Sequence, residues 1–262
     1  MDEARGNLGV PQSDLTKLSE LKQTIRERTN IHPKFGEESE PLVSHKEAIE
    51  KAFDSALIAI TEKLDVHNIT VNIVSKDLGP GHTLRELVNG FAWSRDTVDI
   101  FVNPSHPDID TLLEKAMKRY LGHELHHAKR YEGPGFGTTF FDSLIFEGIA
   151  QHFERELVET DPEEYRYGIS PEKLQGLMLK AEELYDSPSY SLDDHEKWFR
   201  SGSEEEDIPV AAGYAIGYQI VANYLERHKH DQPPVTASSL VLAPAKQLRE
   251  EVHKSVETET DK

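Results

Sequence analysis

The sequence contains no cysteine among its 262 residues. This absence excludes disulfide bonds, thiolate metal sites and a cysteine nucleophile, so a transition-metal site must use histidine and carboxylate ligands. Positive charge is also scarce, because 29 Lys and Arg residues stand against 48 Asp and Glu residues, giving a formal net charge of −19. A field of this sign repels phosphates and anionic lipid head groups, and we expect neither a nucleic acid nor a membrane as partner.

Long apolar runs are absent as well. No stretch approaches the roughly 18 apolar residues that a membrane-spanning helix needs. The first ten residues include Asp2, Glu3 and Arg5 and lack the apolar core of a secretory signal. We therefore expect a cytoplasmic protein, in which a hydrophobic content of 37% supplies a core beneath a heavily charged surface.

The periodicity of apolar residues predicts strands first and helices after, which is typical of the α+β class. We expect a polar, partly flexible lead-in over 1–43, a domain over 44–230, and a short helix with an acidic tail over 231–262. Within the domain, the predicted order is a helix over 44–64, strands over 69–74, 90–93 and 97–102, and helices over 111–131, 139–159, 171–186 and 208–228. The polar stretch 188–207 is expected to form a loop or a lid.

The segment from Leu121 to His127 contains the pattern H-E-x-x-H. Residues four apart on a helix lie on one face, so His123 and His127 can hold one ion from the same side. Glu124 lies about 100° around the helix from His123, where its carboxylate can reach a water on that ion. The residues before the motif are apolar at helical spacing, which favours a buried helix over a surface helix with scattered histidines. Two imidazoles are costly in a core unless something binds them, and a metal would do so.

A catalytic zinc site usually has three protein ligands and one open position, so a third ligand is needed. We predict Glu147, which lies in the apolar segment F-E-G-I-A and requires a polar partner there. Gly148 beside it permits the close approach of another helix. The separation between His127 and Glu147 is sufficient for a turn and an antiparallel return helix.

H-E-x-x-H followed about twenty residues later by E-G-x-A resembles the gluzincin metallopeptidases, the group of thermolysin and the membrane alanyl aminopeptidases. The stretch from Gly90 to Glu159, together with G-Y-A-I-G-Y over 213–218, is similar to a bacterial family of predicted Zn-dependent proteases. The resemblance covers roughly 69–225. It implies a zincin-like fold, in which a small N-terminal β-sheet packs on the active-site helix and a mostly helical part follows.

Carried over by position, the resemblance implies a zinc cofactor with His123, His127 and Glu147 as ligands and Glu124 as general base. One position departs from the pattern of thermolysin-like enzymes, which place an Asp four residues after the glutamate ligand to orient a zinc histidine. The corresponding residue here is Gln151, so the histidines must be supported differently.

The resemblance also implies that the strand containing Gly90, Phe91 and Ala92 is the sheet edge on which an extended peptide pairs by backbone hydrogen bonds. The expected reaction is peptide hydrolysis, in which zinc acidifies a water and Glu124 moves its proton to the leaving amine. The reaction needs another donor for the oxyanion, and Tyr214 is the first candidate. Tyr218, one turn further along the same helix, is the second candidate and a candidate substrate contact.

Two other functions remain open. One is a catalytically silent zinc-binding domain that binds peptides or a partner protein, although the base Glu124 would then have no use. The other is a zinc hydrolase acting on a non-peptide amide.

Three weaker features are interpreted without a role in the reaction. His126 points away from the metal face of its helix and is expected to be structural, and His152 is expected at the surface. The acidic run from Glu204 to Asp207 is favoured as a solvated charge cluster over a calcium site.

Overall fold

The structure is a computed structural model that describes residues 24–159, 162–187 and 190–252. Residues 1–23 of the predicted lead-in and 253–262 of the predicted tail lie outside the described residues. The elements follow in the order β1 (His32–Phe35), the 3-10 helix η1 (Glu37–His45), α2 (Lys46–Thr61), β2 (Thr70–Ser75), α3 (Leu84–Leu87), β3 (Val88–Ser94), β4 (Thr97–Val102), α4 (Ile109–Arg130), α5 (Phe140–Leu157), the 3-10 helix η2 (Pro162–Arg166), α6 (Pro171–Glu182), α7 (Leu192–Glu196), the π-helix η3 (Lys197–Ser201), α8 (Ala212–Arg227), the 3-10 helix η4 (Ser238–Leu240) and α9 (Ala245–Val252).

A mixed sheet forms the N-terminal half, with its strands in the order β1-β2-β4-β3. β2 pairs in parallel with both β1 and β4, whereas β3 and β4 form the predicted antiparallel hairpin. Alternation along β4 buries Val98, Ile100 and Val102 on one face, as a sheet covered on that face requires. β1 was not predicted from the sequence, because its residues from His32 to Phe35 lie within the predicted lead-in.

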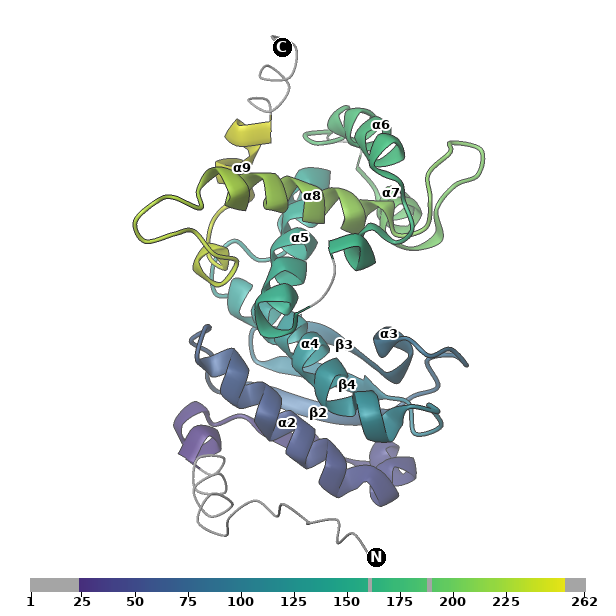
Figure 1. The fold of residues 1–262 in the computed structure, drawn as a ribbon, viewed down its shortest axis with the longest axis vertical. Helices are drawn as coiled ribbons and strands as arrows, with labels where there is room; N and C mark the ends of the chain where they lie inside the picture. Colours follow the sequence, from purple (N-terminus) through teal and green to yellow (C-terminus); the bar gives the residue numbers. More distant parts are fainter. Residues whose placement is uncertain (1–23, 160–161, 188–189, 253–262) are drawn as a thin grey trace, which may run out of the picture.

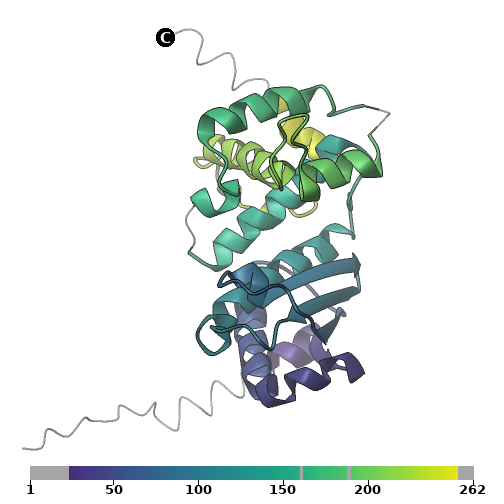
Figure 2. The same ribbon diagram turned by 90° about the vertical axis from the view of Figure 1, so that its right-hand side faces the viewer.

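Helices α2 and α4 lie side by side against the same face of this sheet (Figure 1). The apolar face of α4 buries Leu113, Met117 and Leu121 completely or nearly so, which is why a helix with so many charged residues packs in the core. The sheet packed on α4, followed by a mostly helical C-terminal part, confirms the predicted α+β class. Figure 2 shows the helical half stacked on the sheet half along the long axis of the molecule.

Helix α5 leads from the sheet half into the helical half, and α8 crosses it (Figure 1). A capping box at Thr139 and Asp142 fixes the start of α5. Two glycines face each other where the helices cross, because a β-carbon on Gly148 would collide with the backbone of Gly217. Among the described residues, no helix has the length and apolar character needed to cross a bilayer.

The stretch 188–207 differs from the predicted loop. Its described part contains α7 and the π-helix η3, which bury Trp198 and Phe199 under α5 and α8. These two aromatic residues add apolar area to the core. The segment was predicted as a loop because charged residues outnumber apolar ones along it. The acidic run that follows is bound by lysines, with Lys197 and Lys180 on Glu206 and Lys173 on Asp207. The carboxylates of Glu206 and Asp207 therefore act in ion pairs.

The helix crossing gives a direct test of the packing. A β-carbon at Gly217 would overlap the backbone carbonyl of Leu144, and backbone cannot move aside as a flexible side chain can. We expect Gly217→Ala to lower the free energy of unfolding by about 1–3 kcal/mol or more, measured by chemical denaturation. A β-carbon on Gly176, in α6, would meet only open space, so Gly176→Ala should instead raise stability by about 0.5–1 kcal/mol. Equal effects of the two substitutions would contradict the tight crossing.

Candidate metal site

Two histidines on α4 and one glutamate on α5 converge in the interior. The Oε2 atom of Glu147 lies 3.2 Å from Nε2 of His123 and 3.4 Å from Nε2 of His127. The three ligand atoms all lie within 4.8 Å of one another. Ligand atoms held at 2.0–2.1 Å by a tetrahedral zinc ion are separated from each other by about 3.3 Å. The spacing of the two nitrogens from the carboxylate oxygen therefore fits such an ion.

The polar atoms of this cluster are buried, and protein groups do not satisfy them all. Glu147 Oε2 and His127 Nδ1 have no hydrogen-bond partner among the described residues. The ring of His127 stacks on Phe146 at 3.9 Å with an interplanar angle of 8°, which fixes its orientation. A buried oxygen without a partner, aimed at two ring nitrogens, is what a cation between them would satisfy.

The electrostatics of the cluster favour a positive charge. Burial by itself would raise the pKa of Glu147, but His127 and His123 hold it well below the usual range. Burial lowers the pKa of His127 to about 4, so this ring is neutral and able to ligate at neutral pH. The pKa of His123 is instead raised, because its contacts with Glu147 and Glu154 outweigh the effect of its burial. In the protein alone, a protonated His123 ring is therefore the positive charge that these carboxylates favour.

Glu124 lies next to the cluster and is only 5% exposed. Burial raises its pKa to about 7, while the nearby His123 charge and a backbone hydrogen bond from Ala92 oppose the rise. Gly90 faces it from β3, and a β-carbon there would collide with the Glu124 side chain. The glycine therefore allows the edge strand to approach the carboxylate. A carboxyl with a pKa near neutrality can both accept and return a proton.

The residue that supports His123 was not predicted from the sequence. Glu154 Oε1 lies 2.5 Å from His123 Nδ1, and its Oε2 accepts a 2.5 Å hydrogen bond from Arg119. Arg119 also donates to Glu164 at 3.1 Å, and its guanidinium lies over the ring of Tyr165. Glu154 follows Glu147 by seven residues, which is two turns along the same face of α5. That spacing, with a charge inside an apolar helix, was the signal available in the sequence.

The two tyrosines expected near the site have different surroundings. Tyr214 is partly buried, and the charge of Glu147 is the largest influence raising its pKa, followed by burial. Tyr218 instead stacks between His152 and Tyr165, at 4.1 and 4.7 Å, and its hydroxyl accepts a hydrogen bond from Arg155. These contacts give Tyr218 a packing role, and its contact with substrate stays a prediction.

The strand expected to bind substrate is an edge strand, since β3 pairs only with β4 in the described sheet. Ala92 is buried on the side of Glu124, whereas Phe91 points to the other face, where it is 44% exposed and contacts Trp93. The backbone of β3, more than the Phe91 side chain, is therefore placed near the cluster. The role of these residues in substrate binding stays a prediction.

Two nearby histidines belong to the core. His126 is fully buried beside Phe153, in agreement with the structural role expected of it. The prediction of a surface position for His152 was wrong, because its ring is 5% exposed and its Nε2 lies 2.9 Å from the carbonyl oxygen of Tyr218. The face of α5 opposite the cluster is covered by α8, which helical geometry alone does not reveal.

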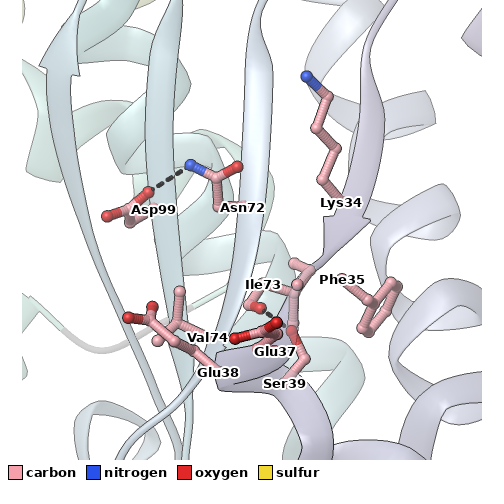
Figure 3. A pocket seen from close by; sticks show the side chains of 10 residues that line it. Lys34, Phe35, Glu37, Glu38, Ser39, Asn72, Ile73, Val74 and Asp99 are labelled. Atoms are coloured by element: carbon pink, nitrogen blue, oxygen red, sulfur yellow. Dashed lines mark hydrogen bonds between the residues drawn. The ribbon is translucent and has the colours of Figure 1, made fainter.

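A separate pocket lies on the open face of the sheet (Figure 3). Asp99 lies at one side of it, and its carboxylate accepts hydrogen bonds from Asn72 and Trp93. Lys34, at the other side, donates to Thr70. These polar groups satisfy one another, and no histidine lines the pocket. The chemistry of the molecule is concentrated between α4 and α5.

Comparison with known proteins agrees with this geometry. A family described as "Predicted Zn-dependent protease (DUF2268)" matches residues 49–248. The "Uncharacterized protein YjfC" of Bacillus subtilis is 23% identical over 155 residues, which cover 53% of this chain and 48% of that protein. The match therefore spans about half the length of this relative. Because the family match extends over most of the chain and includes the His123, His127 and Glu147 cluster, the chain belongs to this predicted Zn-dependent protease family.

Proposed function

We propose that this protein is a zinc-dependent peptidase whose metal is held by His123, His127 and Glu147. The observation that carries the proposal is the convergence of the two Nε2 atoms on Glu147 Oε2 at 3.2 and 3.4 Å, with the buried Glu124 beside them. A zinc ion bound there supplies the Lewis acidity that acidifies a water and polarises the scissile carbonyl.

Protein residues perform the proton transfer, the stabilisation of the oxyanion and the alignment of the substrate. Glu124 accepts the proton of the attacking water and delivers it to the leaving amine, for which its pKa near 7 is suited. Tyr214 is protonated at neutral pH, as tyrosine ordinarily is, and its hydroxyl donates a hydrogen bond to the carbonyl oxygen. The unpaired edge of β3 aligns the peptide backbone alongside Glu124.

The direct test combines metal analysis with turnover. We expect purified protein to contain one zinc ion per chain and to cleave members of a fluorogenic peptide library. Chelation should abolish cleavage, and added zinc should restore it, because the acidified water depends on the ion. Cleavage that survives complete metal removal would overturn the proposal. Bound zinc without cleavage would favour the catalytically silent domain, and cleavage confined to small amides would favour the non-peptide hydrolase.

The general base is tested by Glu124→Gln. The amide keeps the shape of the side chain but cannot take a proton, so we expect zinc content to be unchanged and turnover to fall by about 10²–10⁴-fold. Glu114 on the same helix is exposed and accepts a hydrogen bond from Ser55, so Glu114→Gln is the matched control. Full turnover by Glu124→Gln would remove this residue from the mechanism.

The support of His123 is tested by Glu154→Gln. A neutral amide makes a weaker hydrogen bond to His123 Nδ1 and loses the ion pair with Arg119, so the ring is held less firmly. We expect zinc affinity to fall by about 10–100-fold in competition with a chromophoric chelator. Glu156, two residues further, instead binds Ala237 and Ser238, so Glu156→Gln should leave zinc affinity unaltered. Equal affinities in the wild type and Glu154→Gln would show that Glu154 does not support the metal.

A further inference from the structure

Tyr167 stands out among the described residues near the metal cluster because its backbone and side chain are both constrained. It follows η2 and has a φ of 53°, in the left-handed region that non-glycine residues with large side chains rarely adopt. The residue as a whole is 38% exposed, so packing in the core alone does not explain the conformation. Strained residues of this kind concentrate at functional sites.

The hydroxyl of Tyr167 is held by the helix that carries the glutamate ligand. Nε2 of Gln151 donates a 3.2 Å hydrogen bond to the Tyr167 oxygen. Gln151 is 2% exposed and lies one turn after Glu147 on the same face of α5. Because the amide nitrogen is the donor, the hydroxyl oxygen is the acceptor, and the hydroxyl retains its own proton for another hydrogen bond.

Tyr167 is paired with Tyr214. Their ring centroids lie 5.8 Å apart, although one residue follows η2 and the other is on α8. Burial and the charge of Glu154 raise the pKa of Tyr167, and Glu147 and burial raise that of Tyr214. A tyrosine is protonated at neutral pH, and these shifts act in the same direction. The ring contact with Tyr214 and the hydrogen bond from Gln151, one turn after Glu147, place Tyr167 beside the helix that carries the ligand carboxylate.

Resting on the proposed peptidase function, we propose that Tyr167 is a second catalytic tyrosine, positioned by Gln151 to donate a hydrogen bond to the substrate carbonyl oxygen alongside Tyr214. The bond strengthens as negative charge develops on that oxygen, and the tyrosine keeps its proton throughout. Gln151 acts through Tyr167 and is a positioning residue. An aspartate at position 151 would accept the hydroxyl proton and leave none for the substrate.

The proposal is tested by Tyr167→Phe, which removes only the hydroxyl. We expect kcat to fall by about 10–100-fold with little change in KM, because the bond forms mainly in the transition state. Zinc content should be unchanged. In the inactive Glu124→Gln background, the Kd of a substrate peptide should not alter when Tyr167→Phe is added. A phosphinic peptide, whose tetrahedral group carries the charged oxygen, should instead bind the single variant more weakly by about the same factor as the loss of kcat.

Gln151→Leu provides the second variant. It should give a smaller loss of kcat, and the double variant with Tyr167→Phe should be no worse than Tyr167→Phe alone, since the glutamine acts through the hydroxyl. The control is Tyr224→Phe, because Tyr224 accepts a 2.8 Å hydrogen bond from Gln247 in a similar pair further along α8. This control should leave kcat and phosphinic peptide affinity unaltered.

The outcomes separate this proposal from the proposed function. A wild type that neither hydrolyses peptides nor binds the phosphinic peptide removes the peptidase proposal, and Tyr167 with it. An active wild type with unchanged kcat and phosphinic peptide affinity in Tyr167→Phe overturns the role of Tyr167 alone. A Tyr167→Phe variant that loses zinc or its cooperative fold assigns the hydroxyl to structure, as would additive losses in the double variant.

Discussion

A buried carboxylate, Glu154, ties α5 to α4 by hydrogen bonds to Arg119 and His123, and the geometry of the candidate metal site depends on it. Arg119, His123 and His127 recur every four residues along one face of α4. On α5, Glu154 faces the first two of these residues, and Glu147 faces the last two. The earlier residues of α4 therefore pair with the later glutamate of α5, and the later residues of α4 with the earlier glutamate. These contacts fix the register of the two helices. A shift by one turn would separate Glu147 from both histidines.

This arrangement concentrates acidic groups where water is scarce. Glu124, Glu147 and Glu154 are each at most 9% exposed, and Arg119, which pairs with Glu154, is a permanent cation at this face. Buried carboxylates are costly unless positive charge balances them. Glu147 and Glu154 raise the pKa of His123, so the protein alone favours a proton on this ring. A divalent cation meets the same need more fully and leaves both imidazoles neutral, as ligation requires.

The sequence was sufficient for the features that depend on local periodicity. The hairpin of β3 and β4, the helices α4 and α5, and the proximity of His123, His127 and Glu147 follow from period-two and helical patterns and from motif spacing. Features that depend on distant contacts were not predictable in this way. β1 is recognisable as a strand only through its pairing with β2, and the π-helix only through the core that receives Trp198.

Glu154 lies between these cases. Its place two turns after Glu147 was readable from the sequence, but the partner that justifies a buried charge there is Arg119, from another helix. Tyr167 was less accessible still. Its backbone is left-handed, and its hydroxyl contacts Gln151 on α5. This contact depends on how η2 packs against α8, which the sequence does not reveal. Residue spacing along one helix therefore predicts which side chains share a face. The residues that this face contacts on other elements are known only from the folded structure.

The face of α5 explains the departure at position 151. In thermolysin-like enzymes, the residue four after the ligand glutamate is the acid that orients a zinc histidine. Here Glu154, one turn further along the same face, contacts His123 and is itself fixed by Arg119. Residue 151 therefore does not have to orient the histidine. A neutral amide with donor groups can stand there without loss of the hydrogen bond that holds the His123 ring. Because glutamine donates to the Tyr167 oxygen where aspartate would only accept, the hydroxyl keeps its own proton.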